Sequence, residues 1–406
     1  MDEDVSRIGA RIAELRKIHG VTQRALALRA NVSYSLLRKV ETGERSGSPS
    51  FVTAVARALS LHVVDLTELH VVDLTEQPYR SGNASVTTEQ TGIPALRQAL
   101  GEGDNPELDT ATRDLADLRA AVAEIKDHDR RTRHAEAVLV LPDVLRHLHR
   151  AEHEAPVGAR AAVYELLAAA YSYAVVALWR LGHLDLARLA DERARTAAVR
   201  GDDPLRAAVA EWNHSLILLL DESYPAGLRS IGRAGTLLAE APCGVASAAV
   251  WGALHLRAAI LAARAADPDL AETHLAEAQA LAAPGQDQAN YYGTKFSAPN
   301  VAIHRVAVPV ELLDGTTAVH RAASVCLPAA TAPSRVGAYW IDVARGWLLH
   351  GDRGNALDAL QTARRIAPQL TRYHPQVHDI VQTLAARDHR ATATLPRFAA
   401  WCGVRT

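Results

Sequence analysis

The sequence predicts an all-α protein with a small N-terminal domain and a larger C-terminal one. Of its 406 residues 49% are hydrophobic but only 5% are aromatic, and Ala, Leu and Arg dominate, which is typical of packed helices. A chain of this length exceeds what one hydrophobic core usually supports. Of the 44 basic and 46 acidic residues, ten and six lie in residues 1–60, so this segment carries +4 and the remainder −6.

Five short helices are expected in the first domain. Apolar residues recur at helical spacing across residues 8–19, which predicts the first helix. Thr22 and Ser33 are candidate N-caps for a second and a third helix that are separated by a tight turn. A fourth helix is predicted after Pro49, and residues 63–66 can form a short fifth one.

The second and third helices form the arrangement with which small domains read the DNA major groove. Leu37 and Val40 are expected to face the core of this domain, and the residues between them to face outward. Arg and Lys on an outward helix face in a net-positive domain can contact phosphates, and hydroxyl side chains can reach base edges. The alternative for these cations is a merely solvated helix face.

The stretch TQRALALRANVSYSLLRKVETGERSGSPSFVTAVARALSLHVVDL resembles the Cro/repressor (Xre) family over its whole length, including the Thr-Gln that opens the second helix. The resemblance implies a five-helix helix-turn-helix domain in which Gln23 contacts the phosphate backbone. It places a further set of side chains against the major groove: Ser33, Tyr34, Ser35, Arg38 and Lys39. Family members often carry Gln, Arg or Asn at position 34, so bidentate base readout is not expected from the tyrosine found here.

The octapeptide LHVVDLTE occurs twice, at residues 61–68 and 69–76. Eight residues are not a whole number of turns, so the second copy rotates its apolar face by roughly 80°. We interpret it as a tolerated insertion at a domain boundary; the alternative is that it retunes the distance between two reading heads. Residues 77–105 are rich in Gly, Pro, Ser and Thr and are predicted to be a linker. The first domain is therefore placed at residues 1–76 and the second at 106–406.

The second domain is predicted to be a helical solenoid. Amphipathic helices follow one another in pairs, separated by Gly, Asp and Pro, and such pairs bury their apolar faces only by stacking on their neighbours. The best unit, residues 337–368, resembles a tetratricopeptide repeat (TPR) at Trp340, Val343, Ala344, Trp347, Ala356, Leu360, Ala363 and Pro368. Two further units show the same offsets, at Ala259, Ala271, Leu275 and Ala278, and more weakly at Tyr171, Leu178, Ala187 and Ala194. Small residues at these offsets let paired helices approach closely.

An Xre-type head joined to a TPR-like tail resembles the RRNPP quorum-sensing peptide receptors of bacteria and actinobacterial regulators of that layout. In that group, inner helices line a concave groove in which Asn side chains grip a short peptide. The resemblance implies ligand contacts for Asn213 and Asn300, because an amide offers a donor and an acceptor in one plane. His304 and Glu311 fall on the same helix stripe as Asn300. The alternative is an internal polar network that fixes helix register.

Other classes of function have less support. The chain has no run of about 18 uncharged apolar residues and starts with an acidic segment, so we expect a cytoplasmic protein with no membrane partner. The three cysteines are odd in number and widely spaced, which favours neither disulfides nor a thiolate metal site. His149 and His153 have metal-compatible spacing, but no third ligand is evident. We expect no metal and no cofactor, and without Walker A, dinucleotide or nucleophile-elbow motifs, no enzyme.

The sequence thus predicts a sequence-specific transcriptional regulator. One reading helix is too small for specific affinity, and this motif usually reads two half-sites about 34 Å apart. A homodimer on a double-stranded DNA operator, an inverted repeat, is therefore expected. A peptide or small molecule in the groove would change operator affinity. The alternative is a DNA-tethered protein-interaction scaffold with no small ligand.

Overall fold

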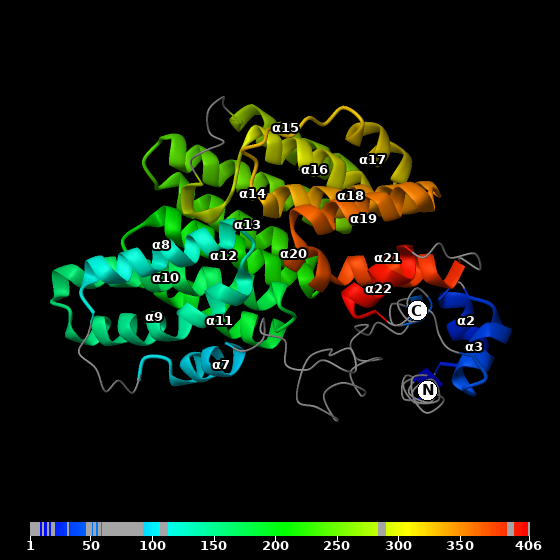
Figure 1. Ribbon diagram of the computed structural model, residues 1–406, viewed down its shortest axis with the longest axis horizontal. Coiled ribbons are helices and arrows are strands. Elements are labelled where there is room, and N and C mark those ends of the chain that lie inside the picture. The colour runs from blue at the N-terminus through cyan, green and yellow to red at the C-terminus, as the bar shows by residue number, and fades with distance from the viewer. Residues whose placement is uncertain are drawn as a thin grey trace. The chain divides into compact units, whose positions relative to one another are not determined.

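Helices form every regular element in the part of the chain that the structure, a computed structural model, describes (Figure 1). That part comprises residues 21–30, 32–45, 92–105, 113–282, 290–387 and 394–404, and positions 9, 12, 13, 16, 17, 51, 54, 55 and 58. The chain divides into two units, residues 1–80 and 81–406. The all-α prediction is confirmed.

In the first unit, helices α2 (Gln23–Arg29) and α3 (Tyr34–Glu41) are connected by a tight turn. Both predicted caps are present: the Thr22 and Ser33 hydroxyls accept hydrogen bonds from backbone amides at 3.2 Å. A small core holds the two helices together, with fully or almost fully buried side chains at Ile12, Leu26, Leu37, Val40, Phe51 and Val55. The described positions of the first and fourth predicted helices are helical. The fifth predicted helix and both octapeptide copies lie outside the described residues.

Helix pairs follow one another along the second unit (Figure 1). The helices are α7 (Ile93–Glu102), α8 (Leu115–Arg130), α9 (His134–Glu154), α10 (Val157–Arg180), α11 (Leu184–Arg200), α12 (Pro204–Leu220), α13 (Tyr224–Ala239), α14 (Val245–Arg264), α15 (Pro268–Leu281), η4 (Tyr291–Gly293), α16 (Ala298–Glu311), α17 (Gly315–Ala322), α18 (Pro333–His350), α19 (Arg353–Ile366), α20 (Pro368–Tyr373), α21 (Pro375–Arg387) and α22 (Thr394–Cys402). The most extensive contacts are α10 with α11, α12 with α13, α14 with α15 and α18 with α19.

The pairs stack into two layers. Helices α10, α12, α14, α16 and α18 each contact the next member of that series and form the inner layer. Helices α11, α13, α15, α17 and α19 pack against them from the outer side. This is the arrangement of a helical solenoid, so the predicted fold of the C-terminal region is confirmed.

Small residues at the predicted repeat offsets lie between paired helices. Ala344 of α18 and Ala356 and Ala363 of α19 have no exposed surface, and Ala271 and Ala278 of α15 are equally buried. A methyl side chain at these positions lets two helix backbones approach closely, and a larger one would have to displace the neighbouring helix. The small residues at these positions therefore set how closely the paired helices pack.

The start of the solenoid meets its far end. The backbone amide of His134, at the start of α9, donates to the side-chain oxygen of Gln369 in α20 at 3.1 Å, across 235 residues of sequence. Tyr373, also in α20, packs against the hydrophobic core shared by α8 to α11. The first and last parts of the solenoid are therefore in contact with each other.

Part of the predicted linker is folded. Within residues 77–105, α7 buries Leu96 and Leu100 completely against α9, so the linker prediction is wrong for this stretch. Its Pro residue occupies the first helical turn, where the missing amide hydrogen is tolerated. Composition alone did not reveal the helix because Gly and Pro flank a short apolar stripe.

Two helices, α10 and α14, are long and apolar enough to cross a membrane by length and composition. In each helix, 61% of the apolar 18-residue stretch is buried inside the protein. Both belong to the inner layer, where an all-round apolar surface is needed to contact helices on both sides. Their composition is that of core helices.

Candidate functional site

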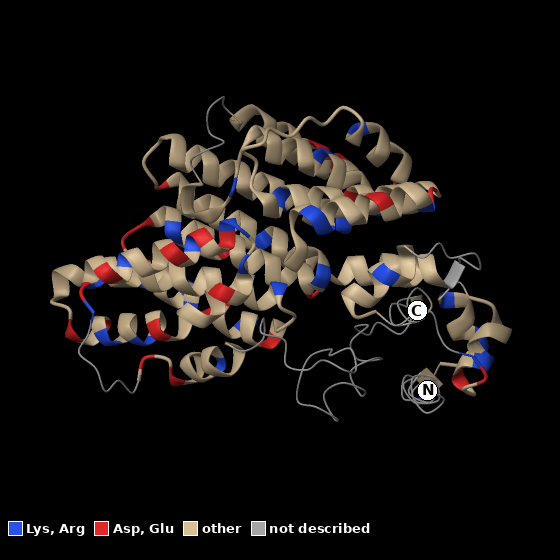
Figure 2. Cartoon of the chain, in the orientation of Figure 1, with Lys and Arg blue, Asp and Glu red and all other residues tan. Residues whose placement is uncertain are grey.

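One face of α3 is polar and open to solvent. Tyr34, Ser35, Arg38 and Lys39 are exposed, whereas Leu37 and Val40 on the opposite face are buried. No ion pair engages either cation within the described residues of this unit. Figure 2 colours the positions of Lys and Arg along the ribbon blue. The face predicted to read DNA is therefore presented to solvent.

Gln23 links α2 to α3. Its amide nitrogen donates to a Glu41 carboxylate oxygen at 2.6 Å, and its amide oxygen accepts a long 3.4 Å bond from the Tyr34 hydroxyl. Glu41 is also paired with Arg16 at 2.8 Å. The exposed Arg24 guanidinium lies 5.7 Å from the centroid of the Tyr34 ring. Arg24 is a cation beside the reading helix that the sequence analysis missed.

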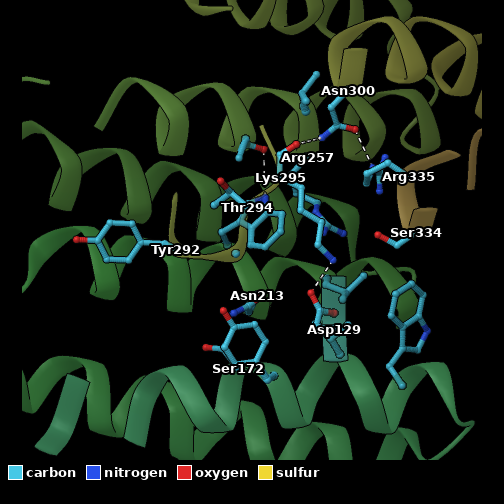
Figure 3. Close-up of a pocket in the computed structure, with 18 of the residues that line it drawn as sticks. Asp129, Ser172, Asn213, Arg257, Tyr292, Thr294, Lys295, Asn300, Ser334 and Arg335 are labelled. Atoms are coloured by element: carbon cyan, nitrogen blue, oxygen red, sulfur yellow. Dashed lines mark hydrogen bonds and ion pairs between the residues drawn. The ribbon is translucent and has the colours of Figure 1, made fainter. Parts of the chain in front are cut away.

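A cavity lies against the inner layer of the second unit (Figure 3). Its volume is about 120 Å³. Residues from α8, α9, α10, α12, α14, α16 and α18, and from η4 and the segment after it, line it. They are Asp129, His134, Ala169, Ser172, Tyr173, Val176, Trp179, Arg180, Arg206, Trp212, Asn213, Leu216, Ala253, Leu256, Arg257, Tyr292, Gly293, Thr294, Lys295, Asn300, His304, Ser334 and Arg335.

The segment between η4 and α16 covers one side of the cavity. Its backbone turns sharply, with φ of +80° at Gly293 and +56° at Lys295. The Phe296 ring packs directly on the backbone of α14 at Gly252, where an added Cβ would lie 2.0 Å from the ring. The Lys295 ammonium forms an ion pair with Asp129 at 2.7 Å, shown as a dashed line in Figure 3. Gly252 is therefore needed to seat this segment.

Three of the four predicted ligand residues line the cavity: Asn213, Asn300 and His304. The Asn300 amide nitrogen donates to the Lys295 carbonyl at 3.0 Å, and its oxygen accepts from Arg335 at 2.8 Å. His304 Nδ1 lies 2.8 Å from the Asn300 carbonyl oxygen, so Nδ1 carries the proton and Nε2 is an acceptor. Burial, aided by Arg335, lowers the pKa of His304 to about 3, and the ring is neutral.

The fourth predicted residue, Glu311, is not among the lining side chains. Its carboxylate pairs with Arg264 and with Arg345, each at 2.7 Å. Burial alone would raise its pKa, but the two guanidinium groups lower it to about 2. Glu311 thus belongs to an internal ion-pair network, which was the alternative to a ligand contact.

Three arginines project into the cavity from different helices: Arg180 from α10, Arg257 from α14 and Arg335 from α18. Within the described residues none of them has a carboxylate at ion-pair distance. Burial and the other guanidinium groups lower the pKa of Arg180 to about 9 and that of Arg257 to about 10, and the pKa of Arg335 is lowered mainly by burial. All three remain protonated at neutral pH, so the cavity has a positive wall.

Several buried polar atoms around the cavity have no hydrogen-bond partner within the described protein. They are Ser334 Oγ, Asp129 Oδ1, His134 Nδ1 and Arg206 Nε. A buried donor or acceptor without a partner costs about 1–3 kcal/mol. Their clustering at one place favours a ligand-binding function for the cavity over a purely structural one.

Residues 7–69 match the family model of a helix-turn-helix domain. The first unit is a helix-turn-helix domain. Among solved structures, the chain is similar to PlcR of Bacillus thuringiensis in complex with the peptide PapR7 and DNA, at 13% identity and a TM-score of 0.29, covering 68% of this chain and 94% of that one. It is also similar to the apo competence regulator ComR of Streptococcus vestibularis, at 15% identity and a TM-score of 0.24, covering 72% and 97%. No curated protein sequence matches it.

Sequence patterns did not single out the cations of the cavity. The available signal was an Arg within a largely apolar stretch of sequence, as in HLRAAILAA around Arg257 and ALWRLG around Arg180. A charge on the buried face of a core helix needs a partner. In a chain so rich in Arg, the signal is visible only after the buried faces of the helices are known.

Within the described residues, no group of three or more His, Cys, Asp and Glu side chains could hold a metal ion. His149, weighed as one metal ligand, contacts the Tyr171 hydroxyl at 2.6 Å and Glu152 at 3.1 Å. Its spacing partner His153 contacts the Asp104 carbonyl oxygen at 2.7 Å. Each ring therefore has a local partner in the folded chain.

Proposed function

We propose that this chain is a cytoplasmic, homodimeric transcriptional regulator whose affinity for an inverted-repeat operator is controlled by a ligand in the solenoid cavity. The observation that carries the proposal is the cavity itself: a set of unpaired cations and unpartnered polar atoms enclosed by the inner helices. It occurs in a chain whose other unit is a helix-turn-helix domain.

The exposed face of α3 supports the DNA-binding part of the proposal. Arg38 and Lys39 are the cations available for phosphate contacts, and the Ser35 and Tyr34 hydroxyls are the groups available for base edges. Gln23 and Ser33 already have partners within the domain. The Gln23 amide donates to Glu41, and the Ser33 hydroxyl caps α3. We propose that they support the reading helix while facing the DNA backbone.

A dimer follows from the size of the reading unit. The eight-residue helix α3 is too short for specific affinity on its own, and two half-sites read together supply it. The ligand would act by favouring one arrangement of the solenoid, because a ligand shifts an equilibrium only by its differential affinity for two states. Of the four ligand contacts predicted from sequence, we retain Asn213, Asn300 and His304, the three that line the cavity.

The test is selection of bound DNA from a random pool with the full-length protein. We expect an inverted repeat to be enriched, and Arg38→Ala and Lys39→Ala each to weaken binding to it about tenfold, through loss of charged contacts. Lys126→Ala is the matched control, since Lys126 is an exposed cation on α8 of the second unit. Failure to enrich any sequence, or equal weakening by the Lys126 variant, would contradict a specific reading face.

The alternative function, a DNA-tethered scaffold for another protein, is favoured by one observation. A groove between α13, α14 and α15 is lined mainly by apolar residues, including Leu228, Ile231 and Trp251. Apolar surface of this kind can accept a partner. A stoichiometric complex that is lost on Ile231→Asp, with operator affinity unaffected by any cavity ligand, would favour the scaffold.

A further inference from the structure

We infer that the cavity of the second unit binds a small organic anion, with its charged group held between Arg180, Arg257 and Arg335. This inference rests on the proposed ligand control of DNA binding, and it specifies the chemistry of the ligand. The family resemblance suggested a peptide held through its backbone amides. The charges in the cavity suggest a ligand with a carboxylate or phosphate group.

The lining of the cavity carries an excess of positive charge. It contains five cations, Arg180, Arg206, Arg257, Lys295 and Arg335, and one carboxylate, Asp129. Burial lowers the pKa of both cavity histidines, His134 to about 4 and His304 to about 3, so both are neutral and the balance is four positive charges. Such an excess in a confined, low-dielectric space is unfavourable unless an anion compensates it. Arg is also the residue whose planar set of donors suits carboxylate and phosphate oxygens.

Most of these cations have no anionic partner at contact distance within the described residues. Lys295 is neutralised by Asp129 at 2.7 Å, and Arg335 donates to the neutral Asn300 at 2.8 Å. Arg257 lies 5.1 Å from the ring centroid of Trp212, a contact that neutralises no charge. The nearest carboxylate on α18, Asp342, is outside the lining and bonds to Arg345 at 3.3 Å. Within the described residues, no carboxylate therefore lies at ion-pair distance from the three guanidinium groups; Asp129 and Asp342 act on Arg180, and Asp342 on Arg335, from farther away.

The remaining lining shows what else the ligand should contain. Trp179, Trp212 and Tyr173 offer aromatic surface beside the cations, and Ser334 Oγ is a buried hydroxyl without a partner. A cavity of about 150 Å³ holds a benzene-sized molecule, so a cavity of about 120 Å³ suits a ligand of roughly that size. A free acid with a short apolar body fits that description, whereas an extended peptide of several residues exceeds it.

The test measures thermal unfolding of the full-length protein with succinate, benzoate and inorganic phosphate, each against chloride at equal ionic strength. We expect at least one of these anions to raise the Tm saturably, because a ligand that binds only the folded state stabilises it. Succinamide and benzamide, which match two probes in shape but lack the charge, should not. Arg257→Met should weaken the apparent affinity about tenfold or more, since a charge-assisted contact is lost.

Arg229→Met is the matched control, because Arg229 is exposed on α13 and is not part of the lining; it should respond as the parent chain does. Arg180→Met provides a second cavity variant if Arg257→Met fails to fold. The inference is overturned if no anion stabilises the parent more than chloride does, or if both cavity variants respond like the control.

The same samples separate this inference from the proposed function. If an anion binds with the expected dependence on Arg257 but operator affinity stays constant, the anion site stands and ligand control of DNA binding is refuted. If operator affinity responds to a neutral compound while no anion binds, ligand control stands and the anion site is refuted.

Discussion

The second unit contains two sets of buried arginines that differ in one respect. In the first, which we call the paired cluster, Arg264 and Arg345 both contact Glu311 at 2.7 Å. In the second, the cavity cluster, Arg180, Arg257 and Arg335 line an open space and have no carboxylate at ion-pair distance within the described residues. Both sets come from inner helices, and both are largely removed from solvent.

The pKa values of the two clusters move in opposite directions. Burial opposes the charged form in both, but Glu311 outweighs it in the paired cluster and raises the pKa of Arg264 and Arg345. In the cavity cluster burial and mutual repulsion lower the pKa. A buried charge whose counterion lies inside the chain therefore supports the fold, whereas a buried charge without such a counterion is available to a ligand.

The largest effect is expected from removing the anion of the paired cluster. Glu311→Gln leaves the buried Arg264 guanidinium without a counterion and leaves Arg345 with Asp342 alone, at 3.3 Å. Breaking a buried pair in this way destabilises a protein by about 3–5 kcal/mol. The measurement is the free energy of unfolding in denaturant. Glu192→Gln, at an exposed glutamate of α11, should change stability by less than about 0.5 kcal/mol. A similarly small loss for Glu311→Gln would mean that the two clusters do not differ.

The next effect concerns the only carboxylate among the lining residues. Asp129→Asn leaves Lys295 without its 2.7 Å partner and adds one positive charge to the cavity. We expect a loss of about 2–3 kcal/mol in unfolding free energy, together with tighter binding of the probe anions described above. Thermal unfolding with and without anion measures both quantities. A loss of stability accompanied by weaker anion binding would argue that Asp129 organises the site rather than opposing its charge.

The fold was predictable from sequence to a greater extent than the cavity. Alanines at positions 344, 356 and 363 recur at offsets that only close helix pairing requires, and the structure buries all three completely. The helix caps at Thr22 and Ser33 are equally local signals. Helix α7 was missed because its apolar stripe is short and flanked by Gly and Pro, so composition outweighed spacing.

The candidate ligand site was predictable only in part. Asn213, Asn300 and His304 were found because they are polar residues on helices assigned to the inner layer, and all three line the cavity. Glu311 has the same helix spacing, but its side chain meets Arg264 and Arg345, which lie 47 and 34 residues away in the chain. Spacing on one helix does not reveal a partner on another. The cavity arginines were missed for the same reason.

A smaller effect is expected from pH. Because the pKa of His304 is about 3 in the folded chain and about 6.5 when unfolded, the unfolded state binds a proton that the folded state does not. Stability from this residue is therefore full above about pH 6.5 and falls on acidification, by about 2 kcal/mol at pH 5. The charged groups facing it are Arg335 and Arg257. Unfolding free energies at pH 7 and pH 5 should differ less in His304→Asn.

Asp342 contributes with the opposite sign. Burial raises its pKa to about 6, so the folded state holds a proton that the unfolded state releases between about pH 4 and 6. Its contribution to stability thus grows on acidification across that window. His304→Asn and Asp342→Asn should therefore change the pH 7 to pH 5 difference in opposite directions. Equal changes in both variants would show that neither residue titrates as described.

The smallest effect distinguishes the two clusters most directly. Arg257→Met removes one charge from the cavity cluster and keeps an apolar side chain against Trp212, which the guanidinium now covers at 5.1 Å from the ring centroid. Relief of repulsion from Arg180 and Arg335 should exceed the lost cation–π contact, so we expect the ligand-free protein to gain about 1 kcal/mol in unfolding free energy. Arg345→Met, made in the paired cluster, should instead destabilise it by several kcal/mol, because Glu311 loses one of its two partners. Chemical denaturation of both variants in chloride buffer provides the measurement. If both are destabilised alike, the cavity arginines support the fold in the ligand-free chain and the contrast between the clusters is lost.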